Sequence, residues 1–264
     1  MSRSQTLIRE LCSRIVVVGE SAATSPKDSN LVLCLAERLA RIQGLAAAKV
    51  ALKGMALFAA DPPQSVVTSR QLQVWLGQEG TLHALSAHCD VKWLVADVGL
   101  QEDYSTAPFG TQVLPQLLKR ISAEPGQAVW DAMHEGVRLA CRMKGRGTDI
   151  FGVCFLPSYE LAPKTVEALE DKKAWPIAAA TGFLLAAAYL QTPVVVSGTA
   201  ALAAVAVAQS LAPAVSGYIL LAQPADNCRF QIDFEPLLTW KAPDPLAVIL
   251  GLDFCQSAAM FNKR

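Results

Sequence analysis

From Ala174 to Ala225 the sequence reads AWPIAAATGFLLAAAYLQTPVVVSGTAALAAVAVAQSLAPAVSGYILLAQPA, with no Asp, Glu, Lys, Arg or His, although 17% of all residues are charged. Prolines at positions 176, 193 and 213 divide this run into apolar pieces. The pieces predict a helix over 177–190, a strand over 194–197, a helix over 199–211 and a strand over 218–222. Strands that are apolar throughout are typical of parallel sheets that helices cover on both faces. The run therefore predicts the core of an α/β fold.

The same alternation extends towards both ends of the chain. Further strands are predicted over 55–60, 91–98 and 148–155, with helices over 5–18, 31–43, 68–87, 112–121 and 125–144 and a helix or loop after Pro245. We therefore predict one domain over residues 1–264. It is a doubly wound, mostly parallel, Rossmann-like α/β sheet with flanking helices, in which the helices of residues 1–45 form a small appendage. The ligand crevice of such a sheet lies at the carboxyl ends of its strands.

Composition argues against several classes of protein. Lys and Arg together number 23, as do Asp and Glu, which leaves no basic excess of the kind that binds nucleic acid. Prolines end each apolar piece before the ~20 residues that a membrane-spanning helix needs, so we expect a soluble, cytoplasmic protein with no membrane span. A formal net charge of zero on so apolar a chain favours association into an oligomer.

The cysteines and histidines indicate no metal site. Seven cysteines are scattered along the chain, none of them in a C-x-x-C pair, and there are three histidines. This pattern is typical of reduced thiols in a protein core rather than of metal ligands or disulfides. We therefore expect no bound metal.

The strand ends offer few catalytic groups. Asp61, Asp97 and Asp226 follow predicted strands, where carboxylates cap helices and form turns more often than they act as bases. The turn Ser197-Gly198-Thr199 joins a strand to a helix, so its backbone N–H groups either bind a phosphate or form an ordinary connection. The residues alone leave both interpretations open.

Several segments, in order, resemble the nicotinate-nucleotide:dimethylbenzimidazole phosphoribosyltransferases. Phe58–Asp61 is similar to the start of that family's F-A-A-D-H-G-V signature, and Glu135–Ala140 (EGVRLA) to its A-G-I-x-L-A helix. Pro193–Ala222 follows the family pattern P-V-V-x-D-G…A-A-L-x-A…L-x-P…Y-L-I-A nearly throughout. The resemblance implies a Rossmann-like fold and transfer of phosphoribosyl from nicotinate mononucleotide to the lower-ligand base of a cobamide.

The departures from the family pattern fall on its chemistry. By the resemblance, Phe155 stands where the family has the glutamate of G-E-M-G-I-G-N-T-T, and Gln256 stands where it has a general base near the end of the chain. A phosphate-contacting segment before the uncharged run is also missing. The resemblance leaves no catalytic residue in this chain and implies vestigial ligand-site positions at Asp61, Arg70, Ser197, Gly198 and Gln223.

Three functions are consistent with these matches and departures. The leading hypothesis is a degenerate subunit, similar to the shortened member of the family's two-subunit branch for phenolic and benzimidazole acceptors. It would form a heterodimer with an intact catalytic paralogue, need no cofactor of its own and leave nicotinate mononucleotide to the partner. The alternatives are a transferase that is active alone, with Asp61 or Asp97 as a relocated base, and a protein that only binds a base or nucleotide.

Overall fold

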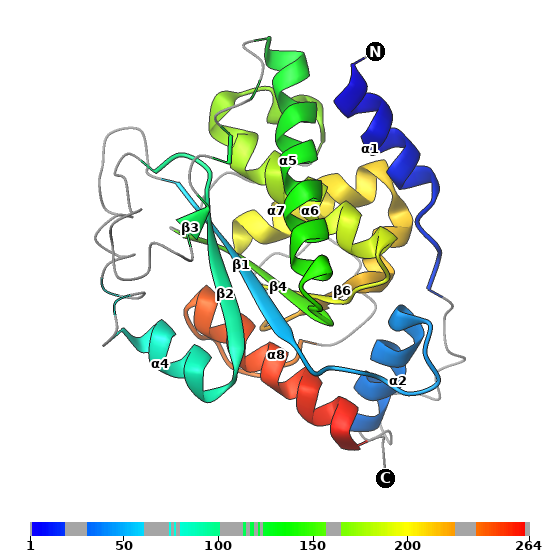
Figure 1. Ribbon diagram of the computed structural model, residues 1–264, viewed down its shortest axis with the longest axis vertical. Coiled ribbons are helices and arrows are strands. Elements are labelled where there is room, and N and C mark those ends of the chain that lie inside the picture. Colours follow the sequence, from blue (N-terminus) through cyan, green and yellow to red (C-terminus); the bar gives the residue numbers. More distant parts are fainter. Residues whose placement is uncertain are drawn as a thin grey trace.

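Six parallel strands form a single sheet with the order β3-β2-β1-β4-β5-β6 (Figure 1). The computed structural model describes residues 2–18, 31–60, 74, 77, 80–100, 113–114, 117–118, 121, 124–156, 165–224 and 236–261. The strands are β1 (Lys53–Ala59), β2 (Val91–Asp97), β3 (Val113–Leu114), β4 (Ile150–Leu156), β5 (Val194–Val196) and β6 (Ile219–Leu221). The strand order reverses between β1 and β4, which is the topology of a doubly wound sheet. The predicted fold class is confirmed.

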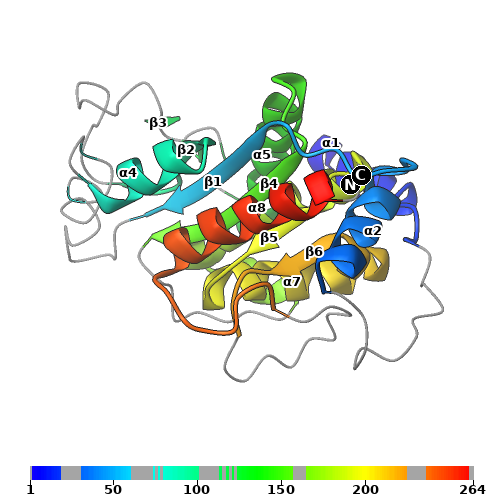
Figure 2. The ribbon, with the colours of Figure 1, turned by 90° about the horizontal axis from the view of Figure 1, so that it is seen from below.

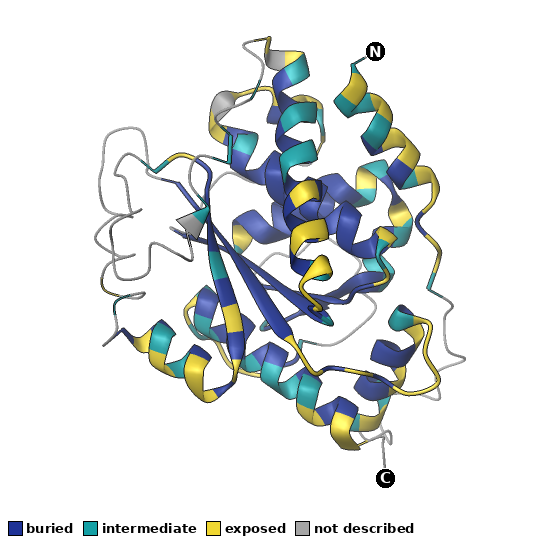
Figure 3. Ribbon diagram, in the orientation of Figure 1, coloured by how far each residue is buried: buried dark blue, intermediate teal, exposed yellow. Residues whose placement is uncertain are grey.

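One face of the sheet is covered by three long helices. They are α5 (Pro125–Gly145), α6 (Trp175–Tyr189) and α7 (Thr199–Leu211), and α1 (Arg3–Ser13) packs outside them on α5 and α6. Almost every residue of α6 is buried, as the dark blue centre of Figure 3 shows. A helix surrounded by protein on all sides gains nothing from polar side chains. The burial of α6 therefore explains why this part of the sequence has no charged residue.

Helices α5 and α6 approach each other closely through glycines. A Cβ atom at Gly136 of α5 would overlap the carbonyl oxygen of Ala179, and one at Gly182 of α6 would overlap that of Met133. Glycine is therefore needed at both positions because no side chain fits between the two backbones. This contact holds α5 and α6 together within the layer of helices.

The other face of the sheet carries α4 (Thr81–His88) and α8 (Asp244–Phe261), with α2 (Leu31–Gln43) packed on α8. Figure 2 shows α8 in red along the strands, with α2 beside its C-terminal half. Short 3₁₀ turns complete the described chain at Glu167–Leu169, Lys172–Ala174 and Pro213–Tyr218. The helices of residues 1–45 thus join different clusters, α1 on the α5 side of the sheet and α2 on the α8 side.

Two predicted helices differ from the structure. The prediction for 112–121 is wrong at its start, because Val113 and Leu114 form the short strand β3 against Val95 and Ala96. The prediction for 5–18 is too long, since α1 ends at Ser13. The predicted helix over 68–87 falls largely outside the described residues, and its last part is α4.

Helix α8 is, among the described residues, the one helix long and apolar enough to cross a membrane by length and composition. Half of that stretch is buried within the fold, where it packs against β4 and α2. The core helix of a soluble protein has the same composition. Packing inside the fold therefore accounts for the apolar character of α8.

Candidate functional site

Three polar side chains meet where β5 and β6 end. Ser197 follows β5, Gln223 follows β6, and Asp244 begins α8. The Ser197 hydroxyl donates a hydrogen bond to Asp244 Oδ1 at 2.8 Å. Gln223 Nε2 donates to both Ser197 Oγ, at 2.9 Å, and Asp244 Oδ1, at 3.1 Å. The carboxyl edge of the sheet, where a doubly wound fold binds its ligands, thus carries a connected group of hydroxyl, amide and carboxylate.

Gln223 also fixes the backbone that carries Asp244. Its Oε1 accepts a hydrogen bond from the Ala242 N–H at 2.6 Å. The same side chain therefore holds the approach to α8 and, through its Nε2, the carboxylate that follows two residues later. A carboxylate held from two directions keeps one orientation, as a site for directed proton or ligand contact requires.

Gly198 leaves the space that the Asp244 carboxylate fills. Gly198 has φ +95 and ψ 154 and precedes the first residue of α7, a backbone conformation that is nearly restricted to glycine. A Cβ atom there would lie 2.8 Å from Asp244 Cγ and would overlap Oδ2. The carboxylate of Asp244 therefore lies directly against the start of α7.

This placement bears on the phosphate-binding interpretation of Ser197-Gly198-Thr199. The N-terminus of a helix attracts an anion through its unpaired N–H groups and its dipole. Here the carboxylate of Asp244 lies next to Gly198 and accepts a hydrogen bond from Ser197 Oγ, so a negative charge is already close to the start of α7. A phosphate at the same position would meet this negative charge at close range and be repelled. The turn is therefore better described as an internal carboxylate contact than as a phosphate cradle.

Sequence analysis missed Asp244. The dipeptide Asp244-Pro245 before an apolar run indicates the start of a helix, but nothing near it in sequence indicates that α8 begins beside β5. Ionised carboxylates accept protons and hydrogen bonds only, so Asp244 is chemically able to act as a base. Burial, and to a lesser degree the charge of Asp244, raises the pKa of the Cys154 thiol on β4, so Cys154 supplies no thiolate to this edge.

Asp97 at the end of β2 has the turn-forming role that was expected of a strand-end carboxylate. Its Oδ1 accepts hydrogen bonds from the backbone N–H groups of Gly99, at 3.0 Å, and Leu100, at 2.8 Å. Such a contact fixes the turn after the strand. The geometry therefore gives Asp97 a structural role and does not favour it as a relocated base.

Phe155 at the end of β4 belongs to the core. Its ring stacks on Phe58 of β1 with 5.3 Å between ring centroids, and Phe58 in turn meets Phe183 of α6 edge to face at 6.2 Å. Aromatic pairs of this geometry bury large areas and stabilise a core. The position that the resemblance assigns to a glutamate thus presents no carboxylate to the strand ends.

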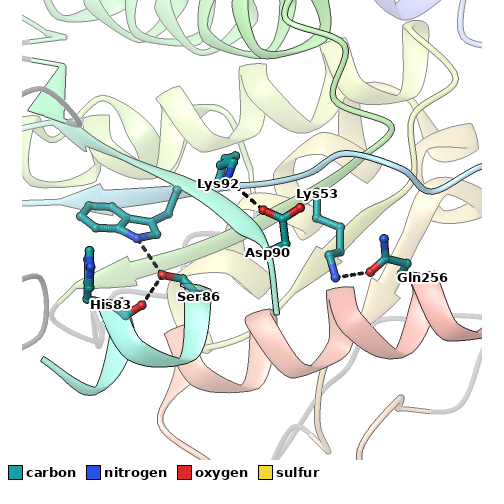
Figure 4. Close-up of polar contacts among 7 residues, drawn as sticks. Lys53, His83, Ser86, Asp90, Lys92 and Gln256 are labelled. Carbon is teal, nitrogen blue, oxygen red and sulfur yellow. Dashed lines mark hydrogen bonds and ion pairs between the residues drawn. The ribbon is translucent and has the colours of Figure 1, made fainter. Parts of the chain in front are cut away.

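Gln256 lies at the opposite edge of the sheet. Its Oε1 accepts a hydrogen bond from Nζ of Lys53, the first residue of β1 (Figure 4). Lys53 also forms an ion pair with Asp253 at 2.8 Å. Asp244 and Gln256 are on the same helix, about 18 Å apart along its axis at 1.5 Å per residue. Gln256 is thus remote from the carboxyl ends of the strands, and its correspondence to the family's base stays a prediction from the resemblance.

Only some of the other predicted site residues lie in the part of the chain that the structure describes. Ser197, Gly198 and Gln223 lie together as described above, whereas Asp61, Arg70 and Asp226 lie outside the described residues. Within the described ranges, no group of His, Cys, Asp and Glu side chains is arranged to hold a metal ion.

Comparisons with known proteins point in one direction. Residues 158–232 match the family described as phosphoribosyltransferase (DBI_PRT), a range that spans α6, β5, α7 and β6. A comparison with curated protein sequences gives no match.

Two crystal structures from Thermus thermophilus share the fold. The structure of CobT has a TM-score of 0.69 and 16% identity over 99% of this chain and 96% of its own. The structure of a nicotinate-nucleotide-dimethylbenzimidazole phosphoribosyltransferase has a TM-score of 0.71 and 15% identity over 100% of this chain and 96% of its own. At this identity the two structures show the fold alone, and together with the match over 158–232 they support the resemblance drawn from the sequence.

Proposed function

We propose that this chain is a subunit of a cytoplasmic phosphoribosyltransferase that transfers phosphoribosyl from nicotinate mononucleotide to a benzimidazole or phenolic base in cobamide synthesis. In this proposal it is the non-catalytic member of a heterodimer, and an intact paralogue binds the donor. The family match over 158–232 and a fold shared over nearly the whole chain support the reaction class. The structure of the strand ends supports the role within the complex.

The observation that carries the proposal is the carboxylate of Asp244 at the start of α7. The phosphate of nicotinate mononucleotide needs a site with positive potential, such as the N-terminus of a helix. In this chain a carboxylate lies beside the start of α7, and Phe155 at a neighbouring strand end is packed into the core. Positioning of the donor would therefore be lost in this chain, and positioning supplies a large part of the rate of a group transfer.

A second function is favoured by the same residue. If the donor lies elsewhere at the carboxyl edge, Asp244 has the chemistry of a general base for the acceptor N–H or O–H, and Ser197 and Gln223 would orient it. A positioned base contributes typically ~10²–10⁴-fold to a rate. The chain would then be active without a partner, through Asp244 rather than through Asp61 or Asp97.

One set of assays separates the two functions. The purified chain, a purified intact paralogue and their mixture are incubated with nicotinate mononucleotide and either dimethylbenzimidazole or a phenol, and the phosphoribosylated product is measured. The proposed subunit role predicts no product from this chain alone, and co-sedimentation and a higher rate in the mixture. Product from this chain alone that is lost in Asp244→Asn would establish the second function. A monomer that ignores the paralogue and forms no product would overturn both.

A further inference from the structure

Helix α8 is apolar on the side that faces away from the sheet, as well as on the side that packs against it. Apart from Asp244 and Gln256, which bond within the fold, its residues that are not fully buried lie within one arc of about 120° around the helix axis. These residues form what we call the α8 stripe: Leu246, Leu250, Asp253, Phe254, Ser257, Met260 and Phe261. Met260 and Phe261 are 58% and 56% exposed. Packing inside the fold accounts for the buried side of α8 and leaves the stripe unexplained.

The α8 stripe is the reverse of an ordinary exposed helix surface. A helix at the surface of a soluble protein normally carries charged and polar residues on its outer side, as α5 does with Arg138 and Arg142. In the stripe the one ionisable side chain is Asp253, and Lys53 neutralises it through an ion pair at 2.8 Å. Contiguous exposed apolar surface of this kind marks a site of association. The stripe therefore indicates a surface that another molecule covers.

The helices on either side of α8 add almost no charge to this surface. Helix α4 contains no Asp, Glu, Lys or Arg and exposes Ala84 and Ala87. Helix α2 exposes one acid and one base, Glu37 and Arg41. Both helices pack on α8, and Figure 2 looks onto the layer that the three helices form, with α8 in front of the strands. Among the described residues, the outer surface of this layer is thus apolar along its centre and balanced in charge at its margins.

The absence of charge favours a second copy of this chain as the molecule that covers the stripe. In a two-fold symmetric contact each surface meets its own duplicate, so a surface with charge of one sign repels itself, whereas a neutral surface does not. The whole chain has a formal net charge of zero, so two copies do not repel each other at longer range either. A helix that lies on a membrane instead carries Lys and Arg beside its apolar residues, and α8 has neither.

The size of this surface is adequate for a dimer. Helices α8, α2 and α4 comprise 18, 13 and 8 residues, which at 1.5 Å per residue gives lengths of about 27, 20 and 12 Å. With neighbouring helices roughly 9 Å apart, their outer sides cover about 500 Å² in flat projection, and the accessible area of the side chains is larger. Stable interfaces bury about 600–1,000 Å² on each partner. The layer of three helices therefore reaches the lower end of that range.

We propose that the α8 stripe is the contact surface of a symmetric dimer of this chain, with Leu250 and Phe254 near the two-fold axis. These two residues lie next to the middle of α8, so an antiparallel pair of α8 helices places Met260 and Phe261 of one copy over Leu246 of the other. The proposal does not rest on the function proposed above, because a subunit that pairs with its own copy can exchange that copy for a paralogue of the same fold.

Sedimentation of the whole chain at micromolar concentration, under reducing conditions, tests this contact. The native chain is expected to sediment with twice the 28.2 kDa mass of one chain. Leu250→Glu puts a carboxylate from each copy at the axis, where like charges oppose association, and is expected to weaken the dimer at least tenfold. Cys141→Glu is the matched control, because Cys141 is exposed on α5, on the opposite face of the sheet, and gains the same charge. Its dimer is expected to stay within twofold of native.

A charge-swap experiment keeps the proposal testable if Leu250→Glu alters the fold. Leu250→Glu and Leu250→Lys are each expected to be monomeric when alone. An equimolar mixture should form a dimer of the two chains, because opposite charges then meet at the axis. Misfolded chains would not regain association on mixing, so this result would support the contact directly.

Several results would overturn the proposal. They are a monomeric native chain, a Leu250→Glu variant that dimerises as the native chain does, an equal loss in Cys141→Glu, and a mixture of the two charged variants that stays monomeric. A native chain that is monomeric alone but binds a paralogue through Leu250 would also overturn the second copy as the occupant of the stripe. That last result would leave the function proposed above standing, so the two proposals fail separately.

Discussion

The carboxylate of Asp244 lies against Gly198, at a distance that admits no side chain between them. The contact joins two elements that are far apart in sequence, the start of α7 and the start of α8. Gln223 and Ser197 complete it with hydrogen bonds to Asp244 Oδ1. At the carboxyl edge of this sheet, the polar side chains therefore converge on the carboxylate of Asp244.

Replacement of Gly198 by alanine should therefore destabilise the protein strongly. The new Cβ would overlap the Asp244 carboxylate, and alanine would be forced into a backbone conformation with φ +95. Strain and overpacking together predict a loss of at least about 2 kcal/mol in the free energy of unfolding. Urea denaturation measures it. Gly126→Ala is the control, because a Cβ at Gly126 meets nothing within 4 Å, and equal losses in both variants would contradict the proposed contact.

Gly182→Ala tests the close approach of α5 and α6. The Cβ would overlap the Met133 carbonyl, and this backbone atom cannot move aside without shifting a helix. Overpacking of this kind typically costs ~1–3 kcal/mol. Gly145→Ala, at the open end of α5, should instead be neutral or stabilise by up to ~1 kcal/mol. A thermal melt in which Gly182→Ala matches the native chain would show that the helices are less tightly packed than described.

The buried thiols predict a loss of stability at alkaline pH. Burial raises the pKa of Cys12 to about 11, and it raises the pKa of Cys154 and of Cys255 as well. Between the ordinary pKa of a thiol and these raised values, the unfolded chain releases protons that the folded chain keeps. The free energy of unfolding therefore falls as pH rises through this range.

Urea denaturation from pH 8 to pH 10.5 under reducing conditions measures this slope. The variant Cys154→Ala/Cys255→Ala removes two of the thiols, so its stability should depend less steeply on pH, whatever its stability at pH 8. Identical slopes in the two proteins would assign the alkaline loss to other groups.

The sequence predicts the fold well where short segments are apolar throughout. The run 174–225 is apolar in every piece, so α6, β5, α7 and β6 are found nearly at their observed bounds. The strand β3 is different, because its two residues are extended only through pairing with Val95 and Ala96. The hydrophobic pattern of residues 112–121 gives no indication of that pairing.

The residues of the candidate site also fall into those that a local sequence pattern predicts and those that it does not. Ser197 and Gln223 directly follow strands, so their position at the carboxyl edge could be predicted from the sequence. Asp244 lies at the same place because α8 begins beside the end of β5, and no local sequence pattern reveals that neighbourhood. Gln256 was assigned to the position of the family's base from a short motif, and 1.5 Å of rise per residue places it at the far edge of the sheet from Asp244 on the same helix.

The last prediction follows from that displacement. Gln256→Glu should restore no transferase activity, either in this chain alone or in a complex with a paralogue, because the new carboxylate would lie beside Lys53 and Asp253 at the amino edge. Activity is measured as product formed from nicotinate mononucleotide and dimethylbenzimidazole, with Asp244→Asn assayed in parallel. If the chain contributes a base at all, that second variant should lower the rate by ~10²-fold or more, while Gln256→Glu leaves it at the native value. A rate that rises with Gln256→Glu would mean that catalysis takes place at the amino edge, contrary to the placement of the site at the ends of β5 and β6.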